Sequence, residues 1–201
     1  AKEEGEQLQT TYHVYDWFLP TGGTLFFVVT YILIVPFVMI YTRGVSDADY
    51  RAPVFAGLLV LAFFVNTLRV GMHNVIKAAG HYRQTQWASL AEAVLNIGLS
   101  VAFVFRFGLV GVAVGTLAST TFFTVYEVFY LSKNILCRSP LLFFRSLLID
   151  AGFVTASLLA THFVPVRSDG YFSWILSALL VFVICLVICV LFQLVFHRRE
   201  A

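Results

Sequence analysis

Polar side chains recur at helical spacing within three long apolar stretches, and they are the residues best placed to do chemistry. Two stretches carry a glutamate and the third carries an aspartate. The first stretch carries Ser89, Glu92, Asn96 and Ser100. The second carries Thr116, Thr120, Thr124 and Glu127, and the third carries Ser146, Asp150, Ser157 and Thr161. Spacing of this kind puts each set on one helical face. Because buried polar groups are costly, three such faces predict a shared hydrated interior.

The charged residues of the apolar stretches leave more than one interpretation open. Glu92 and Asp150 lie well inside their stretches, and each suits either a cavity lining or a hydrogen bond between packed helices. Glu127 lies about one turn from the end of its stretch, from which its carboxylate is placed to snorkel toward the headgroups. Arg69 stands about a turn before Met72 in another stretch, where it either snorkels or contacts a substrate.

Motifs typical of catalysis or metal binding are missing from the sequence. The five histidines are scattered without ligand spacing, and no phosphate-binding glycine loop or nucleophile motif occurs. Cys185 and Cys189 lie one turn apart without a neighbouring ligand, which favours small apolar filler. Gly111, Gly115 and Ser119 form a small-residue ridge that predicts close helix packing. We therefore expect no enzyme, no metal, no cofactor and no nucleic-acid partner.

The elements that must position these residues follow from the composition. Of the 201 residues, 60% are hydrophobic and only 12% are charged, and the mean hydropathy is +0.87. A soluble domain carries about a quarter charged residues and cannot bury so much apolar surface. Spans in lipid must be helices here, because the backbone has to satisfy its own hydrogen bonds. The chain is predicted to be an all-α, polytopic membrane helix bundle.

Six apolar segments have about the 20 residues that a bilayer crossing requires. They cover residues 22–42, 54–72, 87–105, 109–132, 141–164 and 171–196. Together they define a transmembrane domain over 22–196, preceded by an amphipathic lead-in or linker at 1–21 and followed by a tail at 197–201. The chain begins without Met, so we expect it to be a piece of a longer protein.

The charges of the connections predict the orientation. Placing both termini in the cytoplasm puts eight Lys and Arg residues on the cytoplasmic side, four outside, and Arg69 within a span. Cytoplasmic loops carry the excess of Lys and Arg. We expect a multi-pass protein of the inner (cytoplasmic) membrane with both termini cytoplasmic.

Three consecutive motifs carry a resemblance to a known family. They are NVIKAAGHYRQT at 74–85, AEAVLNIGLS at 91–100 and GLVGVAVGT at 108–116. Their order and spacing resemble those of the polysaccharide (O-antigen and capsule type) lipid-linked oligosaccharide flippases, in the multidrug/oligosaccharidyl-lipid/polysaccharide exporter superfamily. The resemblance extends over about 24–136, and the last two segments are generic.

This resemblance implies the C-terminal six-helix lobe of a two-lobe flippase, whose N-terminal lobe is the missing partner. Such proteins move a polyprenyl-diphosphate-linked sugar across the cytoplasmic membrane, and the two lobes alternate around a central cavity. Arg69, Lys77 and Arg83 would attract the diphosphate. The hydrated path would be lined by Glu92, Asn96 and Asp150.

Two other functions stay open at this point. The first is a drug or cation exporter of the same superfamily that uses Glu92 or Asp150 as an ion- or proton-coupled carboxylate. The second is a membrane scaffold or accessory subunit that transports nothing.

Overall fold

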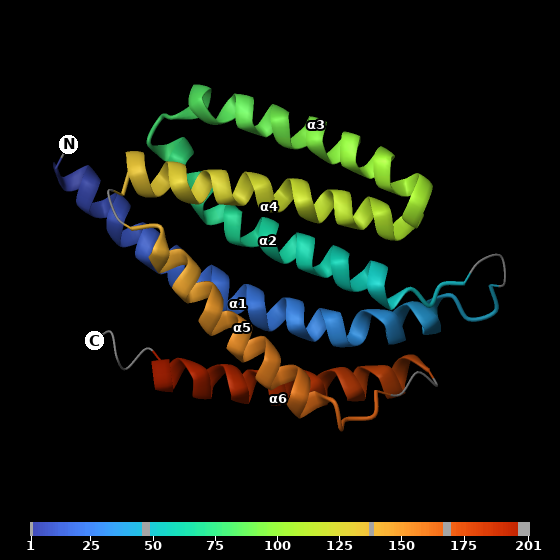
Figure 1. Cartoon of the computed structure of the whole chain (residues 1–201). Coiled ribbons are helices and arrows are strands. Elements are labelled where there is room, and N and C mark those ends of the chain that lie inside the picture. Colours follow the sequence, from blue (N-terminus) through green and yellow to red (C-terminus); the bar gives the residue numbers. More distant parts are fainter. Residues whose placement is uncertain (1, 46–48, 137–138, 167–169, 197–201) are drawn as a thin grey trace. The chain divides into compact units, whose positions relative to one another are not determined.

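The computed structural model of the chain consists of six helices and no strands among the residues it describes, which are 2–45, 49–136, 139–166 and 170–196 (Figure 1). The helices are α1 (Lys2–Tyr41), α2 (Pro53–Ala78), α3 (Tyr82–Phe107), α4 (Leu109–Asn134), α5 (Leu141–Thr161) and α6 (Tyr171–Phe196). Each contains a stretch long and apolar enough to cross a bilayer, and in α1 this stretch is Pro20–Tyr41. The predicted all-α membrane fold is confirmed. The tail at 197–201 lies outside the described residues.

Four helices extend beyond the apolar segments that predict them. α1 begins at Lys2 instead of residue 22, and α4 ends two residues past 132. α2 continues six residues past 72, and α3 begins five residues before 87. These extra turns contain the polar residues Lys77 and Arg83, so hydropathy alone ends the segments early. As a result Arg69 and Glu92 lie deeper inside their helices than the sequence pattern indicates.

The chain divides into two compact units. Unit 1 comprises residues 1–23 and 58–147, and unit 2 comprises 24–57 and 148–201. Unit 1 therefore holds the first part of α1 as far as Gly23, most of α2, all of α3 and α4, and the start of α5. Unit 2 holds the membrane part of α1, most of α5, and α6.

Within unit 1, α3 and α4 form an antiparallel hairpin with closely approaching backbones. They are joined by Gly108, which has a φ of 57° and so adopts a conformation that other residues rarely take. A Cβ atom on Gly115 would lie 2.7 Å from the backbone nitrogen of Ser100, and one on Gly111 would collide with the carbonyl group of Phe103. The small-residue ridge predicted on α4 is thus a packing surface for α3.

α2 and α4 share an apolar core in the same unit. It is formed by Met72, Val75 and Ile76 from α2 with Val128 and Leu131 from α4. Tyr130, Phe143 and Phe144 pack against its edge. This core determines which face of α4 packs on α2. One of its residues, Val128, directly follows Glu127 in the sequence of α4.

Unit 2 has its own core. Val28 and Leu33 of α1 pack with Phe153 of α5 and with Val181, Cys185 and Cys189 of α6. The indole nitrogen of Trp174 donates a hydrogen bond to the carbonyl oxygen of Leu33, at 3.3 Å. Both cysteines are free thiols, and their burial in this apolar core agrees with the prediction that they act as filler.

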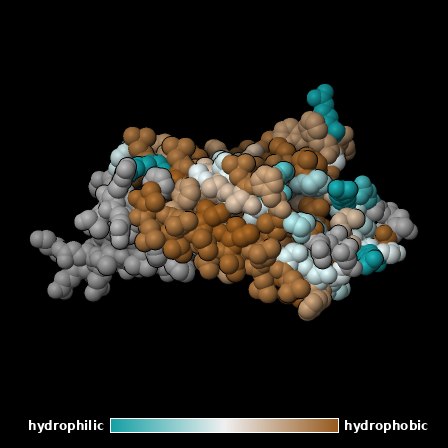
Figure 2. Space-filling view, turned by 90° about the horizontal axis from the view of Figure 1, so that it is seen from below, coloured by the Kyte–Doolittle hydropathy of each residue, from teal (hydrophilic) through white to brown (hydrophobic). Residues whose placement is uncertain are grey.

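Large apolar side chains also cover the outside of the helices. Phe105, Trp87 and Leu109 in unit 1, and Phe163 and Phe172 in unit 2, are largely exposed. Figure 2 shows hydrophobic residues over much of the face it presents. Exposed apolar surface of this extent is expected for helices that contact lipid.

Candidate functional site: an ionic cluster among three helices

Three ionisable residues of unit 1, one from each of three helices, lie at a similar depth. Arg69 lies nine residues before the end of α2, Glu92 ten residues after the start of α3, and Glu127 seven residues before the end of α4. At 1.5 Å per residue these positions are about 10–15 Å from the helix ends. Asn66, Arg69 and His73 share one face of α2, because they are spaced by three and four residues. We name one group of side chains the ionic cluster: Asn66, Arg69, His73, Glu92, Phe123 and Glu127.

Arg69 is held by partners from all three helices. Its Nη1 donates to Oε2 of Glu92 at 2.7 Å, and its Nη2 donates to Oδ1 of Asn66 at 2.6 Å. Its guanidinium carbon lies 4.6 Å from the ring centroid of Phe123, which is a cation–π geometry. The side chains of Arg69 and Glu92 are only 17% and 20% exposed. Arg69 therefore forms an interhelical ion pair, and the two alternatives that the sequence suggests, snorkelling and contact with a substrate, stay predictions.

His73 and Glu127 form the second pair of the ionic cluster. Nδ1 of His73 lies 2.6 Å from Oε1 of Glu127. The Glu127 side chain is fully buried, and its Oε2 atom has no hydrogen-bond partner among the described residues. The expected snorkelling of Glu127 is therefore wrong. Its neighbours Val128 and Leu131 are buried against α2, so packing turns this face of α4 inward.

Asn96 lies one turn beyond Glu92 and connects α3 to α4. Its Oδ1 accepts hydrogen bonds from the hydroxyls of Ser100 and Thr116, both at 3.3 Å. Ser119 and Thr124 donate to carbonyl oxygens of their own helix. The polar faces predicted on α3 and α4 thus meet, and several of their hydroxyls serve to pack the hairpin.

Lys77 and Arg83 lie on either side of the short connection between α2 and α3. Both side chains are exposed, and the structure gives neither of them an ion pair in the described part of the chain. Beside them, His81 Nδ1 lies 2.8 Å from the Tyr130 hydroxyl, and the Tyr126 hydroxyl donates to the carbonyl oxygen of Gln84. The connection is therefore fastened to α4 and presents two free positive charges.

Asp150 is half-buried in α5, within unit 2. Its place in a common path with Glu92 and Asn96 stays a prediction. No group of three His, Cys, Asp or Glu side chains within the described ranges could hold a metal ion.

The ionic cluster contains three residues that the sequence pattern did not single out. His73 and Asn66 could have been found from Arg69, because positions three before and four after it lie on the same helical face. Phe123 carries no such signal, since an aromatic residue in an apolar helix is most often a packing residue.

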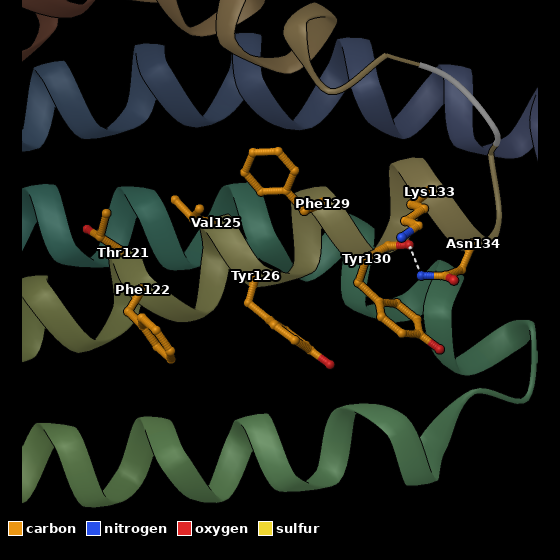
Figure 3. Close-up of a pocket in the computed structure, with 8 residues that line it drawn as sticks. All are labelled: Thr121, Phe122, Val125, Tyr126, Phe129, Tyr130, Lys133 and Asn134. Carbon is orange, nitrogen blue, oxygen red and sulfur yellow. Dashed lines mark hydrogen bonds between the residues drawn. The ribbon is translucent and has the colours of Figure 1, made fainter.

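An apolar groove follows the outer face of α4. It is lined by Thr121, Phe122, Val125, Tyr126, Phe129, Tyr130, Lys133 and Asn134 (Figure 3). In Figure 3 the rings of Phe122, Tyr126 and Tyr130 project from the same side of the helix, and the polar residues Lys133 and Asn134 lie at one end. The groove and the ionic cluster lie on different faces of α4, because the groove residues are separate from the buried set around Glu127.

No protein-family model, curated protein or solved structure matches this chain. The candidate site is therefore defined by its own chemistry: a part-buried Arg–Glu pair, a His–Glu pair whose carboxylate is buried, and two exposed cations at the nearest helix ends.

Proposed function

We propose that this chain is one six-helix lobe of a flippase for polyprenyl-diphosphate-linked oligosaccharides, acting in surface polysaccharide assembly at the cytoplasmic membrane. The observation that carries the proposal is that the motifs with the family resemblance, at 74–85, 91–100 and 108–116, belong to the three helices that contain the ionic cluster. Charged side chains in membrane-spanning helices are costly and mark substrate or ion pathways.

In this proposal the cationic residues bind the diphosphate one after another. Lys77 and Arg83 attract it to the cytoplasmic mouth, where their charges are exposed. Arg69 binds it deeper by exchanging its partner Glu92 for phosphate oxygens, since a guanidinium recognises carboxylate and phosphate with the same paired geometry. Glu92 then regains Arg69 when the substrate leaves. Asn96 and Asp150 offer hydrogen bonds to sugar hydroxyls, and the second lobe completes the cavity.

The proposal is tested by complementation of a strain deleted for the full-length gene. Replacing Lys77 and Arg83 together by Ala is expected to lower surface polysaccharide several-fold at equal protein abundance in the membrane. Arg106→Ala is the matched control, because Arg106 is an exposed cation at the opposite end of α3. Full complementation by the double variant and by Arg69→Ala would overturn the proposal.

One observation favours an ion-coupled exporter of drugs or organic cations as the second candidate. The ionic cluster has two carboxylates for one arginine, and Arg69 is already paired with Glu92. The same deletion strain separates the two functions. Normal polysaccharide together with increased accumulation of a cationic dye would assign the chain to export.

A further inference from the structure

Counting the charges of the ionic cluster gives one negative charge more than its arginine can balance. The ionisable groups that face one another there are Arg69 and His73 of α2, Glu92 of α3 and Glu127 of α4. With both carboxylates ionised and His73 neutral, the sum is −1. Such a charge is unfavourable inside an apolar helix group, because neither lipid nor apolar side chains replace the water that would solvate it.

The geometry locates where the missing positive charge would be held. The pair of His73 and Glu127 has its two polar atoms 2.6 Å apart, a distance that requires a proton between them. One proton makes this a neutral imidazole on a carboxylate. A second proton on the pair makes it either an imidazolium on a carboxylate or an imidazole on a carboxylic acid, and both forms bring the cluster to zero charge.

We propose that the His73–Glu127 pair is a proton-binding site inside the membrane span, and that it holds one exchangeable proton whenever Arg69 is paired with Glu92. An independent observation supports the site: Glu127 is fully buried and its Oε2 has no partner among the described residues, so a free carboxylate there is poorly compensated. The proposal does not depend on which solute the protein moves.

The two residues of the pair have different exposure, which assigns them different roles. The His73 side chain is 27% exposed, whereas Glu127 is not exposed at all. A proton therefore enters and leaves through His73, and the buried carboxyl group of Glu127 retains it.

This proposal links the proton to the state of Arg69. If an anion takes Arg69 away from Glu92 and brings its own negative charge, the cluster needs at least one proton more. If Glu92 is neutralised, Arg69 alone balances Glu127 and the exchangeable proton is released. The number of exchangeable protons thus follows the number of carboxylates minus the number of arginines.

The test counts protons directly in the full chain in lipid nanodiscs at pH 7, by NMR with ¹⁵N-histidine and ¹³C-carboxyl-glutamate labels. Wild type is expected to show either an imidazolium at His73 or a carboxylic acid at Glu127. Glu92→Gln is expected to show neutral His73 with ionised Glu127, hence no exchangeable proton. Arg69→Gln is expected to show two, distributed over Glu92 and the pair. His73→Gln and Glu127→Gln assign the signals.

His81→Gln is the matched control, because His81 bonds to Tyr130 and not to a carboxylate, and it should leave the proton count unchanged. A wild-type chain with neutral His73 and ionised Glu127 overturns the proposal. So does a Glu127 signal that shifts when sodium replaces potassium, since the counter-charge would then be a metal ion. If Glu92→Gln does not fold, the second proton expected in Arg69→Gln decides the matter alone.

Discussion

The partners of Arg69 show how a single charged residue is accommodated in a membrane helix. Its charge is neutralised by Glu92, its side chain is mostly buried, and it also contacts Asn66 and Phe123. Removing one member of this ion pair leaves the other charge without its hydrogen-bonded partner, whereas removing both does not. The energetic coupling between the two side chains is therefore measurable.

We predict that Arg69→Ala and Glu92→Ala each lower the thermal midpoint of the protein in lipid or detergent. The loss in free energy of unfolding should be smaller in the double variant than the sum of the two single losses, by about 1 kcal/mol or more, because the two residues share one interaction. Thermal unfolding of the four proteins forms the cycle. Additive losses would mean that the 2.7 Å contact contributes no coupling.

Glu127 shows why part of the site could not be predicted from the sequence. Its distance from the end of the apolar segment suggests an exposed carboxylate, but α4 extends to Asn134 and its face is determined by packing on α2. The ion pair of Arg69 with Glu92 joins residues 23 positions apart on two helices. Periodicity indicates which residues share a face of one helix, but it does not indicate which other helix packs against that face.

The hairpin of α3 and α4 is the element in which sequence and structure agree most closely. The ridge of Gly111, Gly115 and Ser119 is a local pattern, and its consequence, close approach of a second helix, needs no long-range information. The sequence predicts a hydrated interior shared by three polar faces; two of these faces, on α3 and α4, are in contact through the hydrogen bond from Thr116 to Asn96. The six spans are likewise a local property, because each is set by length and hydropathy.

We predict that Gly115→Ala destabilises the hairpin by about 1–3 kcal/mol, the usual cost of overpacking. The added methyl group would lie 2.7 Å from the backbone nitrogen and the hydroxyl of Ser100, so the two helices must separate.

Gly98→Ala is the matched control, because the same methyl group on α3 would meet no atom within 4 Å. It should be neutral or slightly stabilising, since Ala favours a helix over Gly by up to about 1 kcal/mol. Thermal unfolding of both variants measures the difference, and equal midpoints for Gly115→Ala and wild type would contradict the packing assignment.

At the scale of the whole molecule, the orientation in the membrane decides which solutes can reach the ionic cluster. The exposed Lys77 and Arg83 flank the connection between α2 and α3, and eight Lys and Arg residues of the chain fall on that side by the predicted topology. Positive residues are retained in the cytoplasm during insertion. The cluster lies closer to these helix ends than to the opposite ones, so the proposed function requires them to be cytoplasmic.

We predict that Gln84 faces the cytoplasm and Asp49 faces outward. Both side chains are exposed, Gln84 in the first turn of α3 and Asp49 between α1 and α2. Single cysteines are introduced at these positions in a background that lacks Cys137; Cys185 and Cys189 are buried. A membrane-impermeant maleimide applied to intact cells should label Asp49→Cys at once and Gln84→Cys only after lysis. Labelling of Gln84→Cys alone in intact cells would reverse the orientation, and a diphosphate would then meet Lys77 and Arg83 from outside. The proposed capture of the diphosphate at the cytoplasmic mouth would fail with it.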